Sequence, residues 1–201
     1  ALIRAGEIYF HTKEYNKAIE TFKEVINVTL DDERRIIAHI NIIRAAKRID
    51  NHSEVINSAG QLAGNSNVEP DWQREAQFSR AKAYIALNDI DSAMDDLEPL
   101  AEDTRTKEGA ESKYLLAELM FNDGQYQECE EEILDYIEMS TPHAYWLARS
   151  FVLLADTYVA QGKTMEAREY LVSLQNNYNA DDDIKEMIEE RLSKLENGNN
   201  E

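Results

Sequence analysis

The sequence predicts an all-α solenoid, built from about five helix–turn–helix units and closed by one further helix. Three observations support this prediction. Apolar residues recur every three or four positions along almost all of the 201 residues, which is the helical period. Glycine and proline, the residues that most often interrupt helices, number only seven and three. Finally, a small residue followed by a large one returns at a nearly constant interval, which indicates internal repeats.

The repeat is clearest in the second helix of each unit. In residues 14–22, EYNKAIETF, Tyr15 precedes Ala18 and Phe22 follows it. At spacings of 37, 38, 36 and 38 residues, the equivalents of Ala18 are Val55, Ala93, Cys129 and Ala167. The first helices carry their own small and large pairs: Gly6 and Tyr9, Ala81 and Tyr84, Ala117 and Met120, Ala155 and Tyr158. We expect two helices to approach closely at each small residue, and each unit to cover the apolar face of its neighbour.

The five units are expected at about residues 1–32, 33–66, 70–105, 107–140 and 142–179. Pro70 and Pro142 stand where a helix can begin. Gly124 and Gly162 suit the left-handed residue that ends a helix, so they indicate turns inside the fourth and fifth units. The second unit matches the pattern least well, with Ile43 and Ala46 in its first helix.

A single capping helix is predicted over residues 180–196. Its apolar positions fall on one face: Ile184, Met187, Ile188, Leu192 and Leu195. A stack of repeats leaves its last apolar face uncovered, and a helix with a polar outer side closes it. The remaining residues, 197–201, are expected to form a disordered tail.

Charge and composition exclude several classes of function. The formal charge is −19, with 12 basic and 17 acidic residues in 1–100, and 9 and 23 in 101–201. Nucleic acids require a basic surface, so a nucleic-acid partner is not expected. No apolar stretch reaches the length of about 18 residues that crosses a bilayer, so no membrane insertion is expected. One cysteine excludes an internal disulfide framework and any site with several cysteine ligands.

The motifs of known catalytic sites are missing, and we interpret the chain as not an enzyme. It has no Gly-x-Ser-x-Gly turn, no phosphate-binding glycine loop and no His-Glu-x-x-His helix. The histidines are scattered along the chain, at His11, His39, His52 and His143. Cys129 replaces a small core residue, and the acidic run around it is expected to be a solvated helix face. No catalytic residue, metal site or cofactor is therefore predicted.

The repeated residues resemble those of a known family. Gly6, Tyr9 and Phe10, followed by Tyr15, Ala18 and Phe22, resemble the tetratricopeptide-repeat signature over about residues 1–179. This resemblance implies a right-handed α-solenoid. The period is longer than the family's ~34 residues, and Leu2 and Phe151 stand where the family usually has tryptophan.

Longer, degenerate units followed by a closing helix also resemble the C-terminal part of large bacterial envelope-associated repeat proteins. That narrower likeness implies that further repeats precede residue 1 and favours a location in the cell envelope or periplasm. The targeting signal would then lie outside these residues.

The resemblance further implies that the first helices line a concave groove that binds a peptide or partner protein. The candidate groove residues are Glu7, Phe10, His11, Asn41, Arg44, Lys47, Arg48, Phe78, Lys82, Tyr114, Glu118, Phe121 and Asp156. In this hypothesis the aromatic residues anchor the partner, and the cluster of Arg44, Lys47, Arg48 and Lys82 selects acidic segments.

Two alternatives remain open. The basic residues of the groove could instead pair internally with Glu7, Glu75 or Glu118, as charges on helix surfaces often do. The whole chain could also be a structural spacer or a self-association segment of a larger repeat protein, with no ligand of its own.

Overall fold

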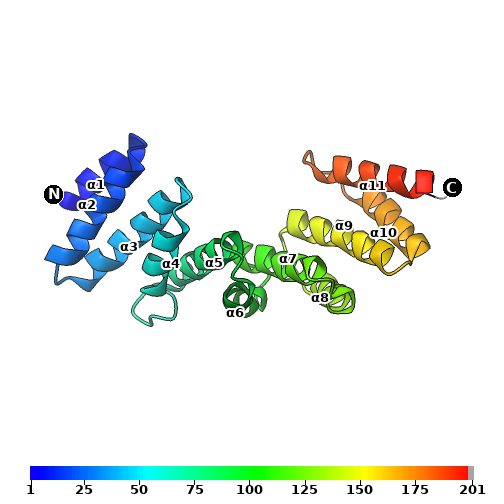
Figure 1. The fold of residues 1–201 in the computed structure, drawn as a ribbon, viewed down its shortest axis with the longest axis horizontal. Helices are drawn as coiled ribbons and strands as arrows, with labels where there is room; N and C mark the ends of the chain where they lie inside the picture. The colour runs from blue at the N-terminus through cyan, green and yellow to red at the C-terminus, as the bar shows by residue number, and fades with distance from the viewer. Residues whose placement is uncertain (199–201) are drawn as a thin grey trace. The chain divides into compact units, whose positions relative to one another are not determined.

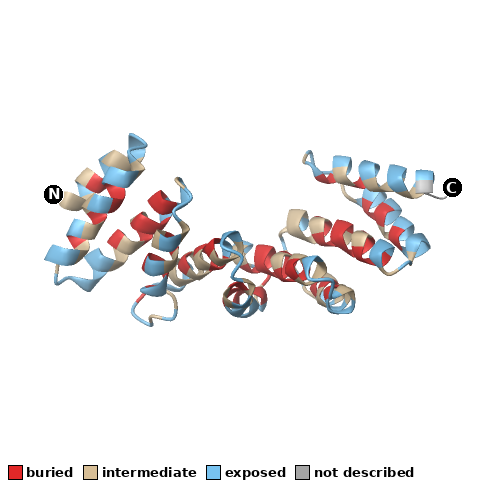
Figure 2. Ribbon diagram, viewed as in Figure 1, coloured by how far each residue is buried: buried red, intermediate tan, exposed pale blue. Residues whose placement is uncertain are grey.

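The computed structural model describes residues 1–198, which form eleven α-helices and contain no strand (Figure 1). The chain divides into two compact units, Ala1–Leu97 and Glu98–Glu201. In both units, consecutive helices pack against each other and bury their apolar sides, while the polar sides remain exposed (Figure 2). No helix among the described residues is both long enough and apolar enough to cross a bilayer.

The first unit contains α1 (Leu2–His11), α2 (Tyr15–Val28), α3 (Asp32–Lys47), α4 (His52–Gly60), α5 (Pro70–Ala86) and the larger part of α6 (Ile90–Ala101). The α3 helix packs on α2 and α4. It also contacts α1 and α5, the first helices of the preceding and the following helix pair. The core of this unit is formed by side chains that include Ala18, Phe22, Ile42, Ile43, Val55 and Leu62.

The second unit contains α7 (Lys107–Asn122), α8 (Tyr126–Glu138), α9 (Ala144–Ala160), α10 (Thr164–Asn177) and α11 (Ile184–Gly198). Its α9 helix contacts α7, α8, α10 and α11. The core includes Ala117, Cys129, Ile133, Leu154, Leu171 and Ile184. Cys129 is fully buried, and its Sγ lies 3.3 Å from the Thr157 Oγ1 of α9.

The turns inside the five helix pairs share one backbone conformation. A residue with positive φ ends the first helix of each pair: Lys13, Asp50, Asn88, Gly124 and Gly162. The next residue then donates its backbone N–H to the carbonyl five positions earlier, as Glu14 does to Tyr9 at 2.8 Å and Lys163 does to Tyr158 at 2.8 Å. Each turn residue lies five positions before the small residue of the second helix. This common register supports the interpretation of the helix pairs as repeats.

Small residues allow the close helix contacts that the sequence predicts. Ala18, Ala93, Cys129 and Ala167 are all 0% exposed. At Gly6, a Cβ atom would lie only 2.7 Å from the ring of Phe22, so even alanine would have to displace that ring. The pairing of Gly6 with Phe22 therefore sets how closely α1 approaches α2.

The closing helix differs slightly from its predicted bounds. It begins at Ile184 rather than at residue 180, and the Asp182 carboxylate accepts the Ile184 backbone N–H at 3.1 Å, which satisfies one of the free N–H groups of the first turn. It extends to Gly198 rather than 196. Ile184 and Ile188 are buried, and Met187, Leu192 and Leu195 pack partly against the same core. Of the predicted tail 197–201, residues 199–201 lie outside the described residues.

Candidate functional site

A cluster of basic side chains lies where α3 and α5 meet in the first unit. Arg44 donates from Nε and Nη2 to the two carboxylate oxygens of Glu75, at 2.8 and 2.7 Å. One turn further, Lys47 Nζ donates to the Ser79 Oγ at 3.1 Å. These two contacts join residues 31 and 32 positions apart, and Lys82 lies one turn beyond Ser79 on α5. We call Arg44, Lys47, Arg48 and Lys82 the basic ridge.

The local sequence explains why the ridge faces outward. In α3, Ile43, Ala45 and Ala46 are buried, so the intervening Arg44 and the following Lys47 and Arg48 remain exposed. The Asp31 side chain begins the helix by accepting the Arg34 backbone N–H. The basic residues occupy the opposite end, where the unpaired carbonyls carry partial negative charge and stabilise cations.

The four members of the ridge have different surroundings. The side chains of Arg44 and Glu75 are 45% and 30% exposed, so their ion pair remains open to solvent. Lys82 lies over the ring of Phe78, with its Nζ 5.4 Å from the ring centroid. Arg48 is exposed, and its guanidinium forms no ion pair within residues 1–198. The alternative of internal pairing is therefore observed for Arg44, which pairs with Glu75.

The pair predicts how the first unit responds to acid. The Arg44 hydrogen bonds, followed by the charges of Arg44 and Lys47, hold the pKa of Glu75 below its ordinary value of 4.5. A carboxylate with a lowered pKa stabilises the folded state above its unfolded pKa, and this contribution disappears as pH falls through the folded pKa. Arg44→Ala should therefore cost about 0.5–1 kcal/mol at pH 7 and less at pH 3. Urea unfolding at both pH values measures the difference. Arg48→Ala, which removes no ion pair, should cost the same at both, and an equal pH response of the two variants would contradict this account.

The other predicted residues of the first unit differ in exposure and in their contacts. Glu7 and His11 are exposed on α1. Phe10 is partly buried and makes edge contacts with His11 and with Tyr15, at centroid distances of 6.0 and 5.5 Å. Asn41 donates its amide to the Ile37 carbonyl of its own helix at 2.8 Å. Phe78 is only 9% exposed, so its ring belongs to the core and is not available as an exposed anchor.

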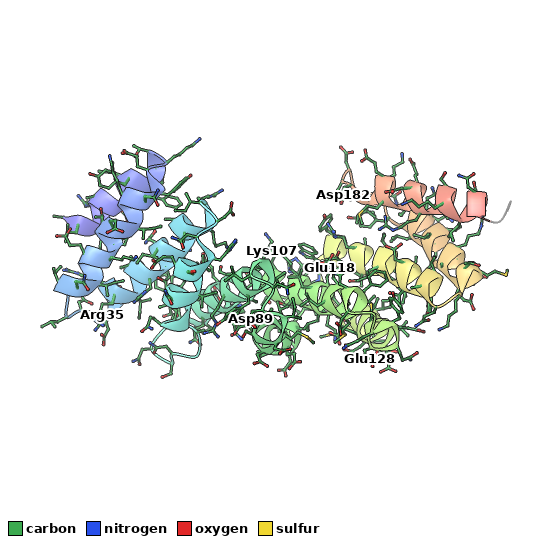
Figure 3. The ribbon with its side chains drawn as sticks, in the orientation of Figure 1. Arg35, Asp89, Lys107, Glu118, Glu128 and Asp182 are labelled. Carbon is green, nitrogen blue, oxygen red and sulfur yellow. The ribbon has the colours of Figure 1, made fainter. Side chains whose placement is uncertain are left out.

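The predicted residues of the second unit are largely engaged in contacts within that unit. Tyr114 is 5% exposed and donates its hydroxyl to Glu118, so it too is a core residue rather than an exposed anchor (Figure 3 labels Glu118). Burial and the bond to Glu118 raise the pKa of the Tyr114 phenol. Phe121 packs on Tyr126, with centroids 5.4 Å apart. Asp156 accepts three hydrogen bonds at 2.7–2.9 Å from one guanidinium, which belongs to Arg191 of the closing helix.

Sequence reasoning missed Arg149, whose guanidinium lies among aromatic rings. Its Cζ is 4.9 Å from the ring centroid of Tyr114, 5.8 Å from that of Tyr145 and 5.9 Å from that of Trp146. It donates to both tyrosine hydroxyls, at 3.0 and 3.2 Å, and lies 3.9 Å from Asp183. The only signal in the sequence is that Arg149 lies on the first helix of its unit, six residues before Ala155.

No group of three or more His, Cys, Asp or Glu side chains within the described residues is placed to hold a metal ion. His39 is partly buried, and desolvation followed by the nearby Arg35 charge lowers the pKa of its imidazole.

Comparisons with known proteins agree with this architecture. Residues 1–32 and residues 145–178 each match a family model described as tetratricopeptide repeat. The fold is similar to a crystal structure of MamA protein, with a TM-score of 0.68 and 16% identity over 96% of this chain and 92% of that one. It is also similar to nearly identical TPR-like repeats of a putative kinesin light chain from Podosopora anserina, with a TM-score of 0.63 and 20% identity over 87% and 92% of the two chains. Two segments of this chain are tetratricopeptide repeats, and its fold is that of a tetratricopeptide-repeat solenoid.

The two matched segments contain α1–α2 and α9–α10. The predicted all-α repeat fold and the family are thus confirmed. Identities of 16% and 20% establish the fold alone. No curated protein matches the sequence with significant similarity. Tetratricopeptide-repeat proteins as a class are scaffolds for protein–protein interaction, which is the general function that the family supports.

Proposed function

We propose that this tetratricopeptide-repeat protein is an interaction scaffold, and that the basic ridge of its first unit binds an acidic segment of a partner protein. One observation carries the proposal. The ridge gathers four cationic side chains on adjoining helices of a chain whose formal charge is −19, and both of its arginines are exposed. Most of the protein is negatively charged and repels acidic segments. A positive surface on such a protein therefore gives an acidic partner one place to bind.

The chemistry of the ridge suits carboxylates. Arginine presents planar, paired donors to a carboxylate, and lysine adds a mobile point charge. Complementary charge mainly speeds encounter and excludes partners of the wrong sign, whereas buried apolar contacts supply most of the affinity. The ridge is therefore proposed to select and orient the partner.

Charge reversal on α3 tests the proposal. Binding of a fluorescein-labelled, glutamate-rich peptide is measured by fluorescence anisotropy, with a lysine-rich peptide as the specificity control. Arg44→Glu/Arg48→Glu should weaken binding of the acidic peptide at least about tenfold, which corresponds to about 1.4 kcal/mol. Arg34→Glu/Arg35→Glu makes the same charge change at the other end of α3 and should have a much smaller effect. Equal losses in the two double variants would show that only net charge matters and that the ridge is not the site.

A second candidate function is self-association, and exposed apolar side chains of the first unit favour it. Ile8, Val28 and Leu30 are 61%, 65% and 98% exposed. Val28 also borders a hollow of about 540 Å³ that is lined by both apolar and charged residues of α1, α2 and α3. Sedimentation velocity should then show a concentration-dependent dimer that Val28→Glu/Leu30→Glu abolishes. A wild-type protein that stays monomeric at high concentration would exclude this function.

A further inference from the structure

Glu75 occupies the position beside Arg44 that a partner's carboxylate would take. Both of its oxygens are engaged by Arg44, in the paired geometry that arginine uses for carboxylates in general. Lys47, whose Nζ bonds Ser79 one turn along α5, adds a second cation nearby. The structure thus shows the ridge with a carboxylate already bound, and that carboxylate comes from the protein itself.

The pair remains accessible to a competitor. The side chains of Arg44 and Glu75 are 45% and 30% exposed, so water and a partner can reach both groups. Exposed ion pairs of this kind are weak, because each charge is nearly as well solvated when the pair is open. An acidic side chain of a partner can therefore replace Glu75 on Arg44 without leaving a buried charge unpaired.

Other ion pairs of the protein differ from this one. Arg80 binds Asp96 with the same paired geometry. The Asp96 side chain, however, is only 6% exposed, so no group of a partner can reach its carboxylate. Asp156 and Arg191 join α9 to the closing helix and are 29% and 25% exposed. The Arg44–Glu75 pair combines paired geometry, exposure and a position within a cluster of cations.

We propose that Glu75 is a built-in competitor of the acidic partner: it holds Arg44 in the free protein and is displaced when the partner binds. This proposal rests on the proposed function of the ridge. Its consequence is selectivity. A segment with a single carboxylate gains little by exchanging places with Glu75, whereas a segment with several carboxylates also engages Lys47, Arg48 and Lys82 and displaces it. Glu75 would thereby set the charge density that a partner needs.

Glu75→Gln separates competition from a structural role. Glutamine keeps the length and shape of the side chain but no longer competes as an anion for Arg44. If Glu75 competes, the variant should bind the labelled glutamate-rich peptide about fivefold to tenfold more tightly than the wild type. Glu20→Gln, the same charge change on an exposed position of α2, should alter binding less than about twofold. Glu75→Asp retains the charge and should bind no more tightly than the wild type.

A double-mutant cycle then tests whether the gain acts through Arg44. In an Arg44→Gln background, Glu75→Gln should improve binding no more than Glu20→Gln does. If Glu75 instead only positions Arg44, Glu75→Gln will weaken binding of the peptide, and the competitor proposal is wrong. Circular dichroism of each variant confirms that it is folded before binding is measured.

The outcomes also distinguish the two proposals. A wild-type protein that binds the peptide, together with a Glu75→Gln variant that binds it equally or less well, overturns only the role of Glu75. A wild-type protein whose binding is unaffected by Arg44→Glu/Arg48→Glu overturns the function of the ridge, and the role of Glu75 with it.

Discussion

Replacing Gly109 by alanine should lower the free energy of unfolding of the second unit by about 3 kcal/mol or more. A Cβ atom at this position of α7 would lie 2.1 Å from the carbonyl oxygen of Asp103 and 2.7 Å from that of Leu100. Both contacts are with backbone, which cannot rotate away as a side chain can. The chain before α7 must therefore move, or α7 must shift along its length.

The surrounding hydrogen bonds make either movement costly. Thr106 caps α7 by accepting the Gly109 backbone N–H at 3.1 Å, and its hydroxyl donates to the Asp103 carbonyl at 3.0 Å. Displacing Asp103 breaks this arrangement and leaves orphan N–H groups in the first turn of the helix. The clash and the lost cap thus add to each other.

Urea unfolding followed by circular dichroism measures the effect, and Gly60→Ala is the matched control. A Cβ at Gly60, the last residue of α4, would meet nothing closer than the Arg80 Nη1 at 3.7 Å. Because alanine favours helix more than glycine, this change should be neutral or stabilising by up to about 1 kcal/mol. A Gly109→Ala protein as stable as the wild type would show that the segment around Asp103 can adjust freely.

Arg80→Ala should be the second most damaging substitution, at about 2–4 kcal/mol. Arg80 of α5 donates from Nε and Nη2 to the two oxygens of Asp96 in α6, at 2.7 and 2.6 Å. Asp96 is only 4% exposed, so removing the guanidinium leaves a carboxylate buried without its counter-charge. The loss of stability thus comes chiefly from burying the Asp96 carboxylate without a counter-charge, rather than from losing the attraction within the ion pair.

Two comparisons isolate that cost. Arg34→Ala breaks an ion pair with Asp31 in which both side chains are well exposed, at 64% and 47%, and should cost less than about 0.5 kcal/mol. The double variant Arg80→Ala/Asp96→Ala removes the unpaired carboxylate at this position and should be more stable than Arg80→Ala alone. If the double variant is the less stable of the two, the Asp96 side chain contributes through packing rather than through charge.

The fold follows closely from local patterns in the sequence. Ala18 and its equivalents predict close helix contacts, because the small residue at this position lies between two helices in every repeat. These small residues are buried in the structure. Ile184 and Ile188 predict the face of the closing helix for the same reason, since three- and four-residue spacings define one side of a helix. The spacing of apolar residues alone did not reveal that the helix begins at Ile184.

The candidate site was less predictable, because it depends on the relative register of helices far apart in sequence. The sequence indicates that Arg44 lies on an outward face of α3, but its pairing with Glu75 requires knowing how α5 aligns beside it. Phe78 and Tyr114 lie on first helices as expected, yet both side chains are buried. Arg191 engages Asp156 only because the closing helix returns to α9, which no local pattern specifies.

The single cysteine gives the second unit a native reporter of its own motion. Cys129 is fully buried between α8 and α9 beside Thr157, and burial raises the pKa of its thiol. A thiol reagent can therefore react with Cys129 only after α8 and α9 separate and the thiolate forms. The rate of labelling then follows the opening of this helix contact, with no introduced probe and no other sulfhydryl in the chain to confuse the signal.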